Sequence, residues 1–123
     1  MFGVFDGHGG ASCADYLKDT LHVNIINQKE FPNDIATAIK RGVHQTESNF
    51  LSEAFQGTLR PHNKAGTCAL LLMIIDSDIW LVNVGDSRAI TSVTDYPSGN
   101  KILYRAQLHR RSEAMIVHGT SYP

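Results

Sequence analysis

The sequence has no long apolar run and no excess of either charge. Its longest apolar stretch, residues 69–75, is far shorter than the ~18 residues that a membrane-spanning helix needs. The net charge of −1 gives no general attraction to nucleic acid or to an acidic membrane surface. These absences argue against a membrane protein and against a nucleic-acid-binding protein, and we expect neither as a partner.

Cysteine is also scarce. Cys13 and Cys68 are the only two, and no C-x-x-C spacing is present. Two cysteines do not form the disulfide framework of a small secreted protein. We expect both to be free, mostly buried thiols in a reducing compartment, and therefore expect a cytoplasmic or nuclear protein. A reactive Cys13 beside the glycine-rich turn is the alternative.

The residues that are present predict one small globular domain. The chain has 123 residues, of which 42% are hydrophobic and 19% charged. Apolar spacing predicts helices over residues 11–23 and 35–55. Strands are predicted over residues 2–5, 67–75, 79–84, 89–94 and 101–106. Residues 107–123 have a mixed pattern and give no prediction.

This order of elements predicts an α+β fold. Two helices precede a run of strands that we expect to form an antiparallel meander, which does not fit a parallel βαβ unit. The strand at 67–75 lacks a polar face, so we expect helices on one side and a second sheet on the other. Ser12 is a candidate N-cap for the first helix, and residues 31–34 form a turn with N-cap chemistry before the second. Gly42 either costs its helix about 1 kcal/mol or permits close packing.

The segment Asp6-Gly7-His8-Gly9-Gly10 directly follows the apolar residues 2–5. It offers a carboxylate, an unhindered backbone carbonyl at Gly7 and an imidazole at the expected end of a strand. Carboxylate and carbonyl oxygens suit Mg²⁺ or Mn²⁺, and a nearby histidine can deliver a proton to a leaving oxygen. Taken alone, the segment also fits an ordinary Asp-Gly turn.

A second acid, Asp86, occurs in the similar setting of residues 84–89. Two strand-end carboxylates suggest a hydrolytic metal centre in which bound metal ions activate a water molecule. Asp86 alone could equally stabilise a turn between strands. The remaining histidines show no metal-ligand spacing, and we expect surface or core roles for them: His22, His44, His62, His109 and His118.

Three segments together resemble one family. Residues 2–10 look like the metal-binding segment of the metal-dependent (type 2C, PPM) serine/threonine protein phosphatases. Residues 65–69, Ala-Gly-Thr-Cys-Ala, resemble the opening of that family's next strand, and residues 82–89 resemble its Gly-Asp-Ser motif. They occur in the family's order, with two helices between the first and the second.

The resemblance implies a fold, a reaction and residue roles. The fold is a sandwich of antiparallel sheets flanked by helices, present here in part over residues 1–106, with a divergent tail at 107–123. The reaction is hydrolysis of phosphoserine or phosphothreonine in phosphoproteins by metal-activated water. Asp6 would bridge two Mg²⁺ or Mn²⁺ ions, the Gly7 carbonyl would bind one, His8 would be the general acid, and Asp86 would help to hold a third ion.

The chain also departs from that pattern. The family has an arginine and a metal-ligating glutamate before the Asp-Gly-His-Gly segment, but only five residues precede Asp6. Its later Asp-Gly-x-Trp-Asp and Asp-Asn motifs do not occur either. We therefore expect an incomplete catalytic domain with little activity by itself and a tendency to associate, although the pattern assigns no oligomeric state.

Two other functions fit the residues less well. A catalytically inactive phosphatase-like module that binds phosphoproteins would explain the missing ligands, whereas the intact Asp6-Gly7-His8 favours an active parent enzyme. A nucleotide-binding glycine loop is the third hypothesis. It is weakened because Gly9-Gly10 is not followed by the Lys-Ser/Thr of a P-loop.

Overall fold

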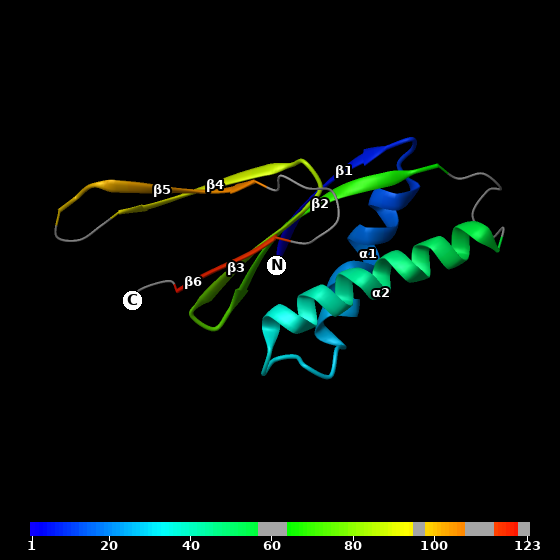
Figure 1. Cartoon of the computed structure of the whole chain (residues 1–123), viewed down its shortest axis with the longest axis horizontal. Coiled ribbons are helices and arrows are strands. Elements are labelled where there is room, and N and C mark those ends of the chain that lie inside the picture. The colour runs from blue at the N-terminus through cyan, green and yellow to red at the C-terminus, as the bar shows by residue number, and fades with distance from the viewer. Residues whose placement is uncertain (57–63, 95–97, 108–114, 121–123) are drawn as a thin grey trace.

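The computed structural model describes residues 1–56, 64–94, 98–107 and 115–120. Within these ranges the chain forms two helices and six strands, shown in Figure 1. Their order is β1 (Phe2–His8), α1 (Ser12–Ile26), α2 (Ile35–Phe55), β2 (Gly66–Ile75), β3 (Asp78–Val84), β4 (Arg88–Thr94), β5 (Lys101–Gln107) and β6 (Met115–Thr120). This is the α+β fold that the sequence predicts.

The strands form two antiparallel sheets. Four strands make one sheet in the order β1-β2-β3-β6, and β4 pairs only with β5 within the described residues. The predicted continuous meander is therefore wrong, because the chain leaves the first sheet after Val84 and β4 does not return beside β3. The place beside β3 is taken by β6, which lies within residues 107–123, where no element was predicted.

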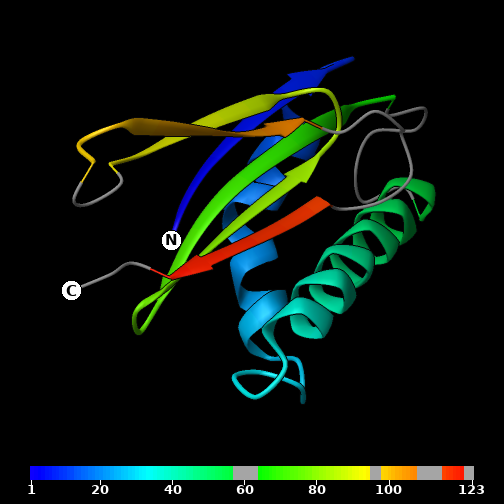
Figure 2. The ribbon, with the colours of Figure 1, turned by 60° about the vertical axis from the view of Figure 1, so that its left-hand side comes forward.

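The two helices cover one face of the four-stranded sheet, and the β4–β5 hairpin extends on the other side (Figures 1 and 2). The core lies under the helices, because alternate residues of β2 and β3 point towards them. The buried members of this core are Leu21, Ile25, Ile35, Ile39, Ala69, Leu71, Met73 and Val82. Neither helix in the described ranges has the length and apolar character needed to cross a bilayer.

Gly42 allows the two helices to approach closely. A Cβ atom at this position would lie 2.6 Å from Ile25 Cγ1 and 2.7 Å from Ile25 Cα. These separations are too short for real carbon atoms, so the backbones of α1 and α2 could not pack as they do around a side chain. Of the two interpretations of Gly42, close packing is therefore confirmed.

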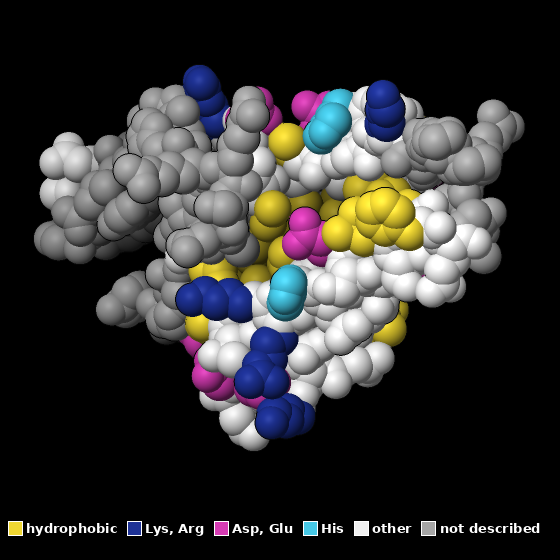
Figure 3. Space-filling model, turned by 45° about the vertical axis from the view of Figure 1, so that its right-hand side comes forward, with side chains coloured by type: hydrophobic (Ala, Val, Ile, Leu, Met, Phe, Trp, Pro, Cys, Tyr) yellow, Lys and Arg dark blue, Asp and Glu magenta, His cyan; other side chains and the backbone are white. Residues whose placement is uncertain are grey.

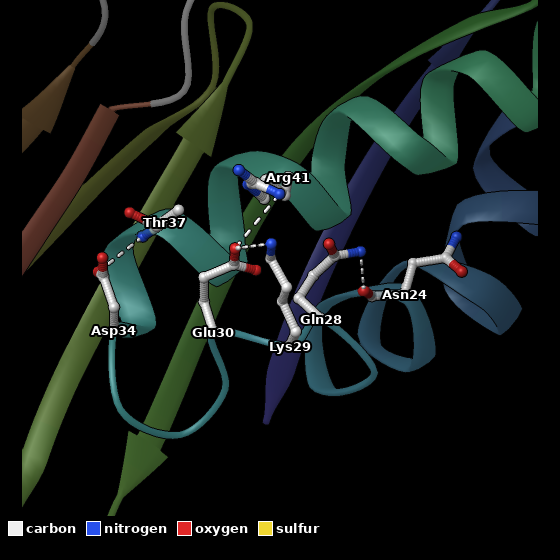
Figure 4. A network of polar contacts seen from close by, with 7 residues as sticks. All are labelled: Asn24, Gln28, Lys29, Glu30, Asp34, Thr37 and Arg41. Carbon is white, nitrogen blue, oxygen red and sulfur yellow. Dashed lines mark hydrogen bonds and ion pairs between the residues drawn. The ribbon is translucent and has the colours of Figure 1, made fainter.

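The connection between the helices is held by polar contacts (Figure 4). Arg41 lies 3.2 Å from Glu30 Oε1, and Asp34 Oδ1 accepts a hydrogen bond of 3.1 Å from the Thr37 amide. The N-cap chemistry predicted for the turn at 31–34 is confirmed, with Asp34 as the cap. The N-cap predicted at Ser12 is wrong, since α1 starts at Ser12 and its cap position, Ala11, makes no side-chain bond. Basic side chains gather beside acidic ones at this lower end of the molecule in Figure 3.

We expect Asp34→Ala to lower the melting temperature at pH 7. The hydrogen bond from Thr37 lowers the pKa of Asp34 below its ordinary value, so the stabilisation is present above about pH 4 and is lost as the pH falls through the folded-state pKa. Melting curves from pH 7 to pH 2 should therefore show the difference from wild type narrowing in acid. A constant difference would contradict a role for the carboxylate charge.

The sheet face away from the helices keeps apolar side chains at the surface. Phe2 is 67% exposed, Val4 62% and Ile74 53%. The strand at 67–75 was expected to be covered on both sides, and at Ile74 this is wrong, because only the helical face is covered there. Apolar side chains also reach the surface on the helical side (Figure 3), where Phe55 is 86% exposed.

Exposed apolar side chains on an edge strand favour association between molecules. We expect the double variant Phe2→Thr/Val4→Thr to sediment more slowly than the wild type at the same concentration in analytical ultracentrifugation. Phe55→Thr is the matched control, because it removes a similarly exposed aromatic group from the end of α2. If only Phe55→Thr sediments more slowly, the molecules associate through the helical side, and the proposed contact through β1 is contradicted.

Candidate metal centre

Asp6 and His8 lie within β1. Asp6 is opposite Cys68 on β2, Gly7 is opposite Thr67 and His8 is opposite Gly66. The predicted strand 2–5 is therefore too short, because pairing with β2 continues through His8. Since side chains alternate along a strand, Asp6 and His8 share the sheet face that points away from the helices.

The imidazole of His8 lies directly over Gly66. A Cβ atom on Gly66 would be 2.5 Å from His8 Nε2 and 2.8 Å from His8 Cε1. The absence of a side chain at Gly66 therefore makes room for the ring. We expect Gly66→Ala to displace His8, and the nuclear Overhauser contact between the His8 ring and the residue 66 α-proton to disappear. Persistence of that contact would contradict this placement.

Asp86 lies in the turn between β3 and β4. The preceding Gly85 has a φ of 106°, a left-handed conformation that favours glycine. A Cβ atom on Gly85 would also lie 2.5 Å from Cys68 Sγ. The Asp86 carboxylate is exposed, and its Oδ1 accepts a hydrogen bond of 3.1 Å from the Cys68 thiol.

Cys68 thus links the two acids that the sequence singled out. It is the strand partner of Asp6, and side chains of antiparallel partners point to the same face with Cβ atoms roughly 5 Å apart. Its sulfur contacts Asp86. Asp6, Cys68 and Asp86 therefore lie in one row across β1, β2 and the turn after β3, with His8 two residues further along the same face.

The donor atoms of this row suit a hard divalent cation. Mg²⁺ commonly binds one or two carboxylates and keeps several water ligands, so Asp6 and Asp86 fit such an ion. Among the described residues, no group of three or more histidine, cysteine, aspartate or glutamate side chains could hold a metal. These carboxylates therefore fit a weakly held ion better than a tightly held pair. The individual ligand roles stay predictions.

The other candidate groups lie away from this row. Burial raises the pKa of the Cys13 thiol, with a smaller contribution from Glu47, which disfavours the nucleophilic thiolate. Cys13 and Cys68 are both free, as predicted. His44 is exposed on α2, 4.0 Å from Glu47. His62 and His109 lie outside the described residues.

A family model described as "Protein phosphatase 2C" matches residues 1–98 of the chain, which include both acids and the strand between them. The chain belongs to the protein phosphatase 2C family. Among curated relatives, Probable protein phosphatase 2C 59 from Arabidopsis thaliana is 42% identical over 91 residues, covering 73% of this chain and 28% of the relative.

Another phosphatase 2C relative is Probable protein phosphatase 2C member 13, mitochondrial, from Oryza sativa subsp. japonica. It is 38% identical over 95 residues, covering 75% of this chain and 24% of the relative. The chain therefore spans about a quarter of each of these two relatives. The matches establish family membership over the aligned residues of this chain.

The fold is that of a solved phosphatase 2C. A crystal structure of serine-threonine phosphatase 2C from Toxoplasma gondii superimposes with a TM-score of 0.68, covering 89% of this chain and 39% of that one. The sequence identity is 18%, so this likeness supports the fold alone. It agrees with the partial phosphatase-type architecture expected from the sequence.

Three residues of the candidate site were not predicted from the sequence. Cys68 contacts Asp86, Gly66 makes room for His8, and Asn83 Nδ2 donates to the Ser87 carbonyl at 2.6 Å. Their roles depend on how β1, β2 and β3 align, which no motif encodes. The one signal present was their position within segments 65–69 and 82–89, next to the candidate ligands.

Proposed function

We propose that this chain is the metal-binding part of a phosphatase 2C domain that hydrolyses phosphoserine or phosphothreonine in phosphoproteins. Mg²⁺ or Mn²⁺, two or three ions in the complete domain, is the proposed cofactor. The observation that carries the proposal is the row formed by Asp6, Cys68 and Asp86, which draws two acids from distant parts of the sequence together.

Each residue has a distinct proposed role. Asp6 and Asp86 bind the cations through their carboxylates, and the Gly7 carbonyl contributes a further oxygen. Such ions lower the pKa of bound water and so supply a nucleophile at neutral pH. His8 is the proposed general acid that gives a proton to the departing serine or threonine oxygen, and the sheet face that it shares with Asp6 supports this role.

The Mn²⁺ site is tested by calorimetric titration of the chain. We expect Asp6→Ala to weaken Mn²⁺ binding by about 10-fold or more, since it removes half of the carboxylate charge at the site. Asp19→Ala is the matched control, because Asp19 is an exposed acid on α1. Equal binding by the wild type and both variants would remove Asp6 from the ligand set.

We also propose that this chain alone turns over phosphoprotein slowly. It covers 24% to 28% of the two relatives described above, and two carboxylates neutralise two Mn²⁺ ions incompletely. Release of phosphate from a phosphothreonine peptide in Mn²⁺ should therefore stay close to the rate without protein. A turnover rate of about 1 s⁻¹ or more, ordinary for enzymes, would contradict this proposal.

The second candidate is a catalytically inactive phosphatase-like module that binds phosphoproteins. It is favoured by the observation that no three metal-binding side chains converge among the described residues. Saturable binding of a phosphopeptide that persists in EDTA and in Asp6→Ala would support it over the enzyme. A cytoplasmic or nuclear location is proposed for either function.

A further inference from the structure

Asn83 is a fully buried polar residue next to the proposed metal centre. It lies on β3, between β2 and β6, and its exposed fraction is 0%. It is opposite Leu70 of β2, which in turn is opposite Val4 of β1. Asn83 therefore faces the same side of the sheet as Asp6. Asn83, Leu70 and Val4 form the neighbouring set of strand partners on that face, two residues along each strand from Asp6 and Cys68.

The amide of Asn83 closes the turn that carries Asp86. Its Nδ2 donates a hydrogen bond of 2.6 Å to the carbonyl oxygen of Ser87. This bond spans the chain from the end of β3 across Gly85 and Asp86, where the backbone takes the left-handed conformation of Gly85. The backbone on both sides of Asp86 is thus fixed relative to β3.

The carbonyl half of the Asn83 amide gains no hydrogen bond from the described residues. Asn83 Oδ1 is buried and has no hydrogen-bond partner among the described residues. An unsatisfied buried acceptor destabilises a protein, and an apolar side chain of similar volume would avoid that loss. Ser87 is only half-buried, so water could replace the donor to its carbonyl. Among the described residues, the contacts of Asn83 therefore give no stability reason for an asparagine over an apolar residue.

We propose that Asn83 is a positioning residue that holds the Asp86 carboxylate in place for a divalent cation. The proposal rests on the proposed function, in which Asp86 is a cation ligand. The amide fixes the turn from the backbone side, while the Cys68 thiol contacts the carboxylate itself. Partners that orient a ligand without touching the metal typically change metal affinity by about 10-fold to 100-fold.

The test compares Asn83→Leu with the wild type. Leucine has a similar volume but cannot donate to Ser87. Mn²⁺ broadens the amide signals of nearby residues in nuclear magnetic resonance spectra, so the Mn²⁺ concentration that half-broadens the Ser87 signal reports binding beside Asp86. We expect Asn83→Leu to raise that concentration by about 10-fold and to leave the melting temperature unchanged or higher.

Thr46→Val is the control for lost buried hydrogen bonds. Thr46 is 1% exposed; its hydroxyl donates to the Gly42 carbonyl at 2.7 Å and accepts a hydrogen bond of 2.8 Å from Asn24 Nδ2, between the two helices and away from the site. We expect this variant to lower the melting temperature without changing Mn²⁺ binding. Asn83→Thr, whose hydroxyl is one bond shorter than the amide, is a second test variant. It should repeat the loss of affinity if Asn83→Leu does not fold.

The outcomes separate this proposal from the proposed function. If Asp86→Asn weakens Mn²⁺ binding but neither Asn83 variant does, Asp86 remains a ligand and the positioning role is overturned. The role is also overturned if the folded Asn83 variants lose affinity only in step with a lower melting temperature, as Thr46→Val would. If the wild type shows no Mn²⁺ broadening at Ser87, both proposals fail together.

Discussion

Gly85→Ala is expected to lower the free energy of unfolding by about 3 kcal/mol and to abolish the contact between Cys68 and Asp86. The left-handed conformation at φ 106° costs an alanine roughly 1–2 kcal/mol. Overpacking adds roughly 1–3 kcal/mol, because the new Cβ would lie 2.5 Å from Cys68 Sγ and 3.2 Å from Cys68 Cα. Chemical denaturation measures the loss directly.

Gly99→Ala is the control that separates these two costs. Gly99 also has a positive φ, 70°, but a Cβ atom there would meet nothing within 4 Å. It should therefore lose only the conformational part, about 1–2 kcal/mol. Equal losses of unfolding free energy for the two variants would show that Cys68 does not restrict the Asp86 turn. Cys68 would then not connect Asp6 with Asp86 across the sheet.

Gly42→Ala is expected to destabilise the protein although alanine is the better helix former. The gain in helix propensity is about 1 kcal/mol. A steric clash opposes this gain, because the new Cβ atom would lie only 2.7 Å from Ile25 Cα and 2.8 Å from Ile25 N. These are backbone atoms that cannot rotate away. The helices must therefore separate, and we expect a net loss of about 2 kcal/mol.

Ser48→Ala is the matched substitution for Gly42→Ala. Ser48 is an exposed residue within the same helix, so the change adds helix propensity without a clash. We expect its free energy of unfolding to rise slightly or to stay within about 0.5 kcal/mol of wild type. If Gly42→Ala is stabilising to the same degree, α1 and α2 do not pack as closely as the structure places them.

Apolar patterns predicted the second helix and the later strands closely. The strands expected at 67–75, 79–84, 89–94 and 101–106 agree within one residue at each end with β2 to β5. The first helix, expected over 11–23, runs from Ser12 to Ile26. The second helix begins and ends where its apolar spacing and Asp34 indicate. The first strand was predicted too short, over residues 2–5, with Gly9-Gly10 expected to break it. Pairing with Cys68, Thr67 and Gly66 instead carries the strand through His8. No local sequence pattern predicts β6, which is recognised only from its antiparallel pairing with β3.

Some residues of the candidate site could be predicted from the sequence and others could not. Asp6, His8 and Asp86 stood out because acids and histidine follow apolar strands beside glycine. Cys68 and Asn83 did not, because a cysteine or asparagine inside a strand has many ordinary roles. Their importance follows from long-range register: Cys68 is opposite Asp6, and Asn83 reaches the turn after its own strand. Register of this kind is set by packing, not by local sequence.

We propose that Asp6 and Asp86 belong to one metal centre and share at least one of its cations. This central claim is tested most directly by following Mn²⁺ broadening of the Gly7 and Ser87 amide signals in the wild type, Asp6→Asn and Asp86→Asn. A shared cation requires each substitution to weaken broadening at both amides, including the one on the distant segment. If each substitution affects only its own segment, or neither has an effect, the two acids do not form one metal centre.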